Sequence, residues 1–249
     1  MLAGYSDSIS VKPGSTLDVR VSTDKPTCTA EVVRLIHGDP NPVGPGYLDE
    51  KTDWLPKKSF PGRVQQLHLG SYLSLPAPRE AISTFTFGCW ILPTNPLPKE
   101  QCIFVWGDTQ HTWTRLFINE AGRLVANLGE AGRCVASVES DALVFPARWQ
   151  FAGILFDREG RELGLFLAQA GATGAQIQRT PATLKTPSFE QEFFYLGASL
   201  ATGKPANAFN GKIGRPVLFT AALNDFGICD LQLGAKPQEP CHCFGDWDL

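Results

Sequence analysis

The sequence predicts an all-β fold, an antiparallel β-sandwich preceded by a β-rich N-terminal segment. Glycine and proline are frequent, with 24 and 19 residues among 249, and this favours many turns. Apolar residues alternate in short runs, as at Phe85, Phe87, Cys89 and Ile91, which is the period of a half-buried strand. Long helical patterns are absent, and an apolar share of 43% excludes intrinsic disorder.

Charge and composition also exclude several classes of partner. The chain has 22 basic and 25 acidic residues, so it lacks the basic surplus expected for binding nucleic acid or an anionic membrane. Its longest apolar runs, such as residues 151–156, fall far short of the roughly 20 residues of a membrane helix. Seven cysteines without a Cys-x-x-Cys pair, and no secretory signal, predict reduced thiols and a cytoplasmic location.

Three stretches follow one another along the chain. Residues 1–78 are proline-rich, and we expect an incomplete β-rich segment with strands around 9–11, 17–21, 32–36 and 64–70. Residues 79–233 carry strands at regular intervals with hairpin loops at 119–122 and 157–161, which is typical of a sandwich or jelly roll. Residues 234–249 form a tail or a junction to a further region.

One short helix is expected near the end of the sandwich. Asn224 or Asp225 is placed to cap it, and Phe226, Ile228 and Leu231 are predicted to face inward.

Metal ligands are sparse. Cys241, His242 and Cys243 are adjacent in sequence, and neighbouring residues alone do not close a tetrahedral site, so we expect no metal there. Asp108 ends a predicted strand and is a weak candidate for Ca²⁺ at a loop rim, the alternative being an Asp that simply forms the turn.

Catalytic constellations are incomplete as well. Glu139-Ser140-Asp141 begins the Glu-x-Asp pattern of jelly-roll glucanases, but the second glutamate is missing. His37, followed by Asp39, and His111 lack a recognisable nucleophile partner and are more simply hydrogen-bonded structural residues. We therefore predict no catalytic residues, and we keep His37, Asp39 and Trp113 as weak binding candidates.

Tryptophan side chains are a further set of candidates for binding a ligand. Four of them could stack on a sugar, although such side chains more often fill a sandwich core: Trp90, Trp106, Trp113 and Trp149.

A motif near the end of the second stretch specifies the fold more closely. Phe209-Asn210-Gly211-Lys212-Ile213 enters a strand through a tight turn, and Ala222-Leu223 follows it. With Phe85-x-Phe87-x-x-Trp90 near the start, residues 81–231 resemble laminin-G-like and concanavalin A-like sandwiches. The resemblance implies a fold and says little about function.

The N-terminal stretch resembles a narrower family. The runs 4–14, Val33-Arg34-Leu35-Ile36-His37-Gly38-Asp39, 44–46, 61–65 and 70–72 occur in the order found at the start of the large (β) subunit of N,N-dimethylformamidase. The resemblance implies hydrolysis of N,N-dimethylformamide to dimethylamine and formate, a small partner subunit, an oligomer, and a mononuclear iron whose ligands lie in a later α/β region.

Two functions follow for this chain. The first is a non-catalytic scaffold or interface part of such an enzyme, inactive alone, holding no cofactor, and partnered by a catalytic α/β region of the same or another chain. The alternative is a stand-alone lectin-like module that binds carbohydrate or protein.

Overall fold

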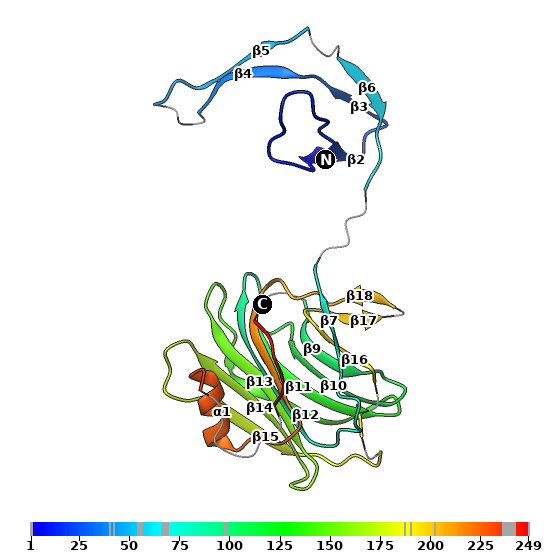
Figure 1. Ribbon diagram of the computed structural model, residues 1–249, viewed down its shortest axis with the longest axis vertical. Coiled ribbons are helices and arrows are strands. Elements are labelled where there is room, and N and C mark those ends of the chain that lie inside the picture. Colours follow the sequence, from blue (N-terminus) through cyan, green and yellow to red (C-terminus); the bar gives the residue numbers. More distant parts are fainter. Residues whose placement is uncertain are drawn as a thin grey trace. The chain divides into compact units, whose positions relative to one another are not determined.

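The structure is a computed structural model that describes residues 2–248 apart from 40, 42, 54–56, 66–69, 97–98, 187, 190, 202 and 236–242. The chain divides into two compact units, Met1–His68 and Leu69–Leu249 (Figure 1).

The first unit consists of three separate two-stranded antiparallel sheets. β1 (Leu2–Ser6) pairs with β2 (Val19–Thr23), β3 (Thr27–Ala30) with β6 (Lys58–Pro61), and β4 (Val33–Gly38) with β5 (Tyr47–Lys51). Thr23 is the only buried residue among those the structure describes in this unit. The unit therefore has strands without a hydrophobic core.

The expected opening strand is displaced. We predicted a strand at 9–11, but the partner of β2 is β1, and Ile9 is fully exposed in the connection. Asp7 closes this connection, because its N–H donates to Asp18 O at 3.0 Å while its carboxylate accepts from Asp18 N at 3.1 Å. Most of the strand expected at 64–70 lies outside the described residues.

The second unit is a sandwich of two six-stranded antiparallel sheets (Figure 1). The first sheet has the order β12 (Arg133–Leu143), β11 (Arg123–Glu130), β10 (Thr112–Ile118), β9 (Gln101–Gly107), β16 (Phe193–Leu196), β7 (Leu73–Pro76). The second has the order β15 (Gln176–Pro181), β14 (Glu162–Gln169), β13 (Gln150–Asp157), β8 (Phe85–Pro93), β19 (Gly211–Phe219), β20 (Cys243–Asp246). A small ribbon of β17 (Ser199–Ala201) and β18 (Lys204–Ala206) accompanies them. The predicted sandwich is confirmed, as are both hairpins.

Aromatic side chains fill the space between the sheets. Phe87 of the second sheet stacks on Phe104 of the first, with ring centroids 4.1 Å apart and planes inclined by 11°. Trp106 stacks on Phe189 at 5.0 Å and is 1% exposed. Trp106 is thus a core residue, since strand alternation turns it inward.

The outer face of the second sheet is covered by α1 (Asp225–Gln232). Ile228 packs there with Phe151, Phe166 and Val217 in a second apolar cluster. Asn224 caps α1 by accepting from Gly227 N at 2.9 Å, as predicted. The prediction for Phe226 was wrong: it is 82% exposed, because Ile228 and Leu231 provide the face that packs on the sheet.

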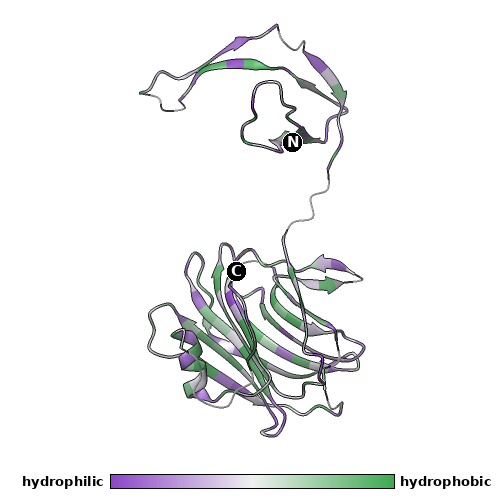
Figure 2. Ribbon diagram, viewed as in Figure 1, coloured by the Kyte–Doolittle hydropathy of each residue, from purple (hydrophilic) through white to green (hydrophobic). Residues whose placement is uncertain are grey.

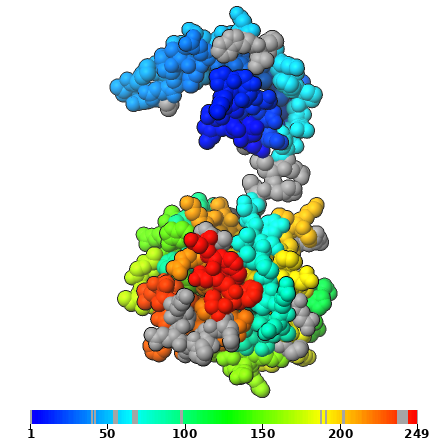
Figure 3. All heavy atoms as spheres, viewed as in Figure 1, coloured from blue at the N-terminus to red at the C-terminus, as the bar shows by residue number. Residues whose placement is uncertain are grey.

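The ends of the sandwich differ from the boundaries set from sequence at 78 and 234. β7 lies before residue 78 and pairs with β16, while Leu73 and Leu75 pack on the core. β20 pairs with β19, and the red C-terminal segment lies on the surface of this unit in Figure 3.

Candidate functional site

One row of side chains crosses five neighbouring strand pairs on the outer face of the first sheet. Strand pairing aligns Tyr195 with Val105, Val105 with Arg115, and Arg115 with Asn127. Ser74 and Ser137 extend the row at its two ends. Because α1, the one helix of the described residues, packs on the other sheet, we call this side the open face.

Arg115 is the centre of the open face. Its guanidinium carbon lies 4.2 Å from the ring centroid of Phe117 and 5.9 Å from that of Trp113. Its Nη1 donates to Glu100 Oε1 at 2.9 Å, and Asn207 Nδ2 donates to the same oxygen at 2.8 Å. The positive charge of Arg115 is therefore balanced by Glu100, and its guanidinium lies against aromatic rings.

A groove of about 630 Å³ opens beside Arg115. Its floor comes from the sheet and includes Trp113, Phe193 and Tyr195, while Ser199 and Gly203 line it from the region of the β17–β18 ribbon. Phe193 is 43% exposed, so an apolar ring is available to a ligand. The lining combines aromatic rings, neutral polar groups and the charged side chains of Asp108 and Arg115, a mixture that suits a polar ligand without net charge.

Asp108 stands at the rim of this groove, where hydrogen bonds occupy both oxygens of its carboxylate. Oδ1 accepts from Gln110 N at 2.8 Å and from His111 Nδ1 at 2.9 Å, and Oδ2 accepts from Gln191 Nε2 at 2.8 Å. Burial alone would raise the pKa of Asp108, but the donors from His111 and Gln110 outweigh it and hold this pKa below its ordinary value. Asp108 thus joins two loops.

Metal coordination finds no support around Asp108. Within the described residues, no group of three or more His, Cys, Asp or Glu side chains could hold an ion. Cys241 and His242 lie outside the described part of the chain. The donor set that the structure describes therefore does not fit an iron centre.

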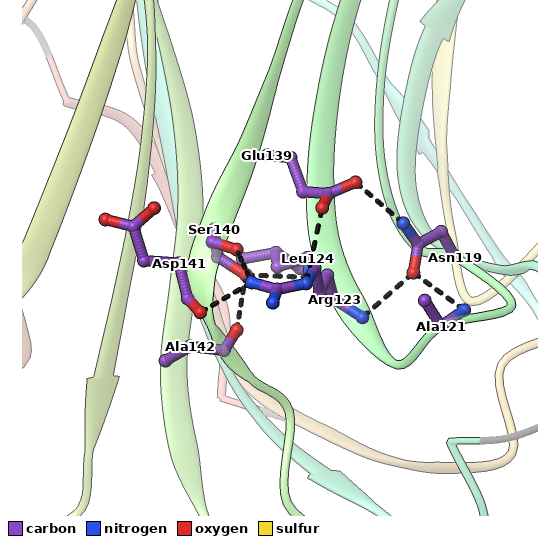
Figure 4. Close-up of polar contacts among 8 residues, drawn as sticks. All are labelled: Asn119, Ala121, Arg123, Leu124, Glu139, Ser140, Asp141 and Ala142. Carbon is purple, nitrogen blue, oxygen red and sulfur yellow. Dashed lines mark hydrogen bonds and ion pairs between the residues drawn. The ribbon is translucent and has the colours of Figure 1, made fainter.

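Glu139 and Asp141 both lie on the edge strand β12, where each contacts a neighbouring side chain (Figure 4). Glu139 accepts from Asn119 Nδ2 at 2.8 Å and lies 3.4 Å from Arg123 Nε. Asp141 points away from Arg123 in Figure 4 and accepts from Gln178 Nε2 at 3.3 Å. The two carboxylates are held by different partners.

Arg123 completes this network through the backbone of β12. Its Nη1 donates to the carbonyl oxygens of Ser140 and Asp141. Ser140 Oγ accepts from Leu124 N at 3.0 Å and donates to Ala142 O at 2.7 Å. These contacts fasten β12 to β11 where their register shifts.

His37 and Asp39 belong to the first unit and not to the open face. His37 Nδ1 lies 2.8 Å from Gly46 O, and Asp39 Oδ1 accepts from Asn41 N at 2.9 Å. Both stabilise the connection between β4 and β5. Trp113 lies in the second unit.

Sequence reasoning singled out Trp113 but missed its neighbours Arg115, Glu100 and Tyr195. The alternation Trp113-Thr114-Arg115-Leu116-Phe117 could have indicated the shared face of Trp113 and Arg115. Glu100 and Tyr195 come from distant segments, and only strand pairing brings them there. Trp90 packs on the second apolar cluster, and Trp149 is 37% exposed.

The fold and motifs agree with known proteins. The family model of the concanavalin A-like lectin/glucanases superfamily matches residues 68–229. The chain belongs to this superfamily. A solved structure, the native heptameric SAP-like pentraxin from Limulus polyphemus, matches 74% of this chain and 90% of its own with a TM-score of 0.52. The two sequences are only 11% identical, so this similarity shows a shared fold and nothing more.

Two curated relatives extend the resemblance to the whole chain. It is 31% identical to the N,N-dimethylformamidase beta subunit of Paracoccus aminophilus and 29% identical to that of an Alcaligenes species. Both alignments cover 100% of this chain and 35% of the relative. The chain thus spans about a third of the length of these curated relatives, and the resemblance predicted from its N-terminal motifs is confirmed.

The described residues contain no helix long and apolar enough to cross a membrane.

Proposed function

We propose that this chain is a non-catalytic scaffold and interface part of an amidohydrolase resembling N,N-dimethylformamidase. The reaction would be hydrolysis of N,N-dimethylformamide to dimethylamine and formate, with the iron site outside these residues. The whole-length alignment to a third of the beta subunit supports the assignment.

A single observation carries the non-catalytic role. The three acidic residues that the sequence singled out in the sandwich, Asp108, Glu139 and Asp141, all accept hydrogen bonds from protein side chains. A general base or a metal ligand needs an oxygen directed at substrate or ion. Their geometry favours a structural role for each.

The partners and location follow from the same proposal. We assign a catalytic α/β region, in the same or another chain, and a small subunit as partners in an oligomer. A cytoplasmic location agrees with thiols that form no disulfide at Cys28, Cys89, Cys102, Cys134 and Cys229.

The test measures dimethylamine release by the purified chain with added iron, and the metal content after dialysis against a chelator. We expect no turnover and well under one iron per chain. Turnover that is lost in Asp108→Asn, or near-stoichiometric bound iron, would place the chemistry in this chain and reject the proposal.

A second function, carbohydrate binding, is favoured by the groove of the open face. The exposed ring of Phe193 and the side chain of Gln191 could stack on and hydrogen-bond a neutral sugar. Calorimetry against a panel of neutral oligosaccharides, with Phe193→Ala as the comparison, tests it. Saturable binding lost in this variant would favour the lectin-like function.

A further inference from the structure

The apolar side chains of the first unit are exposed where a folded domain would bury them. None of the described hydrophobic residues of this unit is buried, and most of the exposed large hydrophobic side chains of the described chain lie here. Leu2 is 70% exposed, Val19 62% and Leu35 56%. Figure 2 shows hydrophobic residues along β4, which has only β5 as a neighbour.

Two-stranded sheets are marginal in water unless a further layer covers them. Each sheet of the first unit has two strands, so ladder pairing within the described residues leaves an edge of each strand open to a further strand. On β2 this edge is partly occupied, because Thr23 N donates to Arg63 O at 2.9 Å and Gln65 Nε2 donates to Val21 O at 2.9 Å. An extensive exposed apolar surface of this kind marks an interaction site.

A groove of about 680 Å³ gives this surface a definite centre. It lies between the β1–β2 and β3–β6 sheets, and its apolar lining includes Leu2, Val19, Val21, Phe60 and Pro61. Cys28 also lines it. Arg20 and Arg63 line it too, so the groove lies between two sheets and combines exposed apolar side chains with two guanidinium groups.

Charge favours a polypeptide over nucleic acid or an anionic surface as the occupant. The first 68 residues contain eight basic and eight acidic side chains, so the unit as a whole has no net charge, although Arg20 and Arg63 add two positive charges to the lining of the groove. Strand edges and an apolar lining together suit strands that carry inward-facing apolar side chains.

We propose that this groove, with the adjoining edges of β1, β2, β3 and β6, receives apolar strands from the remaining part of a beta-subunit-like polypeptide. This inference rests on the proposed function, because it identifies the partner as the part of the curated relatives outside the alignment. The incoming strands complete the core of the first unit. The interface is therefore built by the first unit, and the sandwich is not needed for docking.

The probe is the part of the Paracoccus aminophilus beta subunit outside the aligned third, prepared as a separate polypeptide. It is titrated with the full 249-residue chain, and binding is measured by interferometry. Phe60→Asp and Val19→Asp each place a charge in the groove and should weaken binding about tenfold or more. Both side chains are exposed, 42% and 62%, so the sandwich should retain its melting temperature.

Two controls change apolar residues elsewhere that are even more exposed. Val43→Asp changes a 93% exposed residue of the first unit that does not line the groove, and Phe226→Asp changes an 82% exposed residue of α1. Binding by both should match the unmodified chain. Hydrogen exchange should slow at β1, β2, β3 and β6 in the complex and stay unchanged at α1.

Several outcomes overturn the inference. The unmodified chain could fail to bind the probe, or Phe60→Asp could bind it as tightly as the unmodified chain does. Binding could also be lost in Phe226→Asp alone. The last would move the interface to the sandwich and leave the scaffold function standing. A dimer of the chain that Phe60→Asp dissociates would make a second copy the occupant, and binding to anionic vesicles would make it lipid. Dimethylamine release by the chain alone would reject the proposed function independently of these results.

Discussion

Trp113 and Gly129 face each other on β10 and β11, and the indole occupies the space into which a side chain at position 129 would point. A Cβ at Gly129 would lie 2.0 Å from Trp113 Cε2. The glycine therefore sets the position of the tryptophan that helps to form the floor of the open-face groove.

The first prediction tests this contact. Gly129→Ala should destabilise the sandwich by about 1–3 kcal/mol, because the ring must move within a packed sheet. Thermal unfolding measures the effect. Gly174→Ala is the matched control, since its Cβ would meet only Cys229 Sγ at an ordinary 3.7 Å. Equal melting temperatures for the two variants would contradict the prediction.

Stability should fall in acid through two carboxylates that fasten loops. Hydrogen bonding to Thr186 holds the pKa of Glu130 below its ordinary value. Burial alone would raise the pKa of Asp108, but the hydrogen bonds from His111 and Gln110 outweigh it and lower this pKa. A folded-state pKa below the unfolded one stabilises the protein above the unfolded pKa, and this contribution is lost as pH falls through the folded pKa.

The double variant Asp108→Asn, Glu130→Gln should therefore lower stability at pH 7 by about 1 kcal/mol or less per site, given solvent screening. Its stability should also change less than that of the parent between about pH 5 and pH 3. Urea unfolding over this range provides the measurement. Parallel curves for the two proteins would show that neither carboxylate contributes.

Thiol reactivity should separate exposed from buried cysteines. Burial raises the pKa of Cys102 to about 12 and also raises that of Cys89, so neither forms the reactive thiolate at pH 8. Cys134 and Cys243 are both exposed and should react first with an aromatic disulfide reagent. The double variant Cys134→Ser, Cys243→Ser should lose the fast labelling of these two thiols, whereas fast labelling of Cys89 in the folded protein would disagree with its burial.

The boundary of the sandwich can be tested by truncation. A polypeptide of residues 69–249 should melt at the temperature of the sandwich in the full chain, because every buried hydrophobic residue among those described lies in this unit. Residues 79–249 lack β7 and lose the contacts of Leu73 and Leu75, which should cost about 2 kcal/mol or more. Equal melting temperatures for the two polypeptides would show that β7 is dispensable.

Local patterns predicted the sandwich well because its strands alternate clearly. Phe85, Phe87 and Ile91 are all completely buried, as their spacing required. The hairpin loop at 119–122 was predictable from its turn residues, and Asn119 accepts from Ala121 N there. The periodicity of α1 was too short to decide the direction of Phe226.

The candidate site was less predictable, since it depends on contacts between distant segments. Arg115 contacts Glu100, which lies just before β9, and Tyr195 pairs with Val105 from a segment far along the chain. In the first unit, alternating residues occur without a core to fix their direction, so Ile9 resembled a strand residue and lies in a connection. The alternating apolar residues of the first unit therefore mark its exposed apolar surface and not a core within the unit.

The central position of β8 affects how the protein forms during translation. Phe87 pairs with Ile154 on one side and with Leu218 on the other, more than a hundred residues later. At ribosomal rates of about 5–20 residues per second, β8 waits roughly 7 to 26 seconds for its second neighbour. The nascent chain therefore leaves one edge of this apolar strand unpaired throughout this interval, and we expect its yield in cells to depend on chaperone supply.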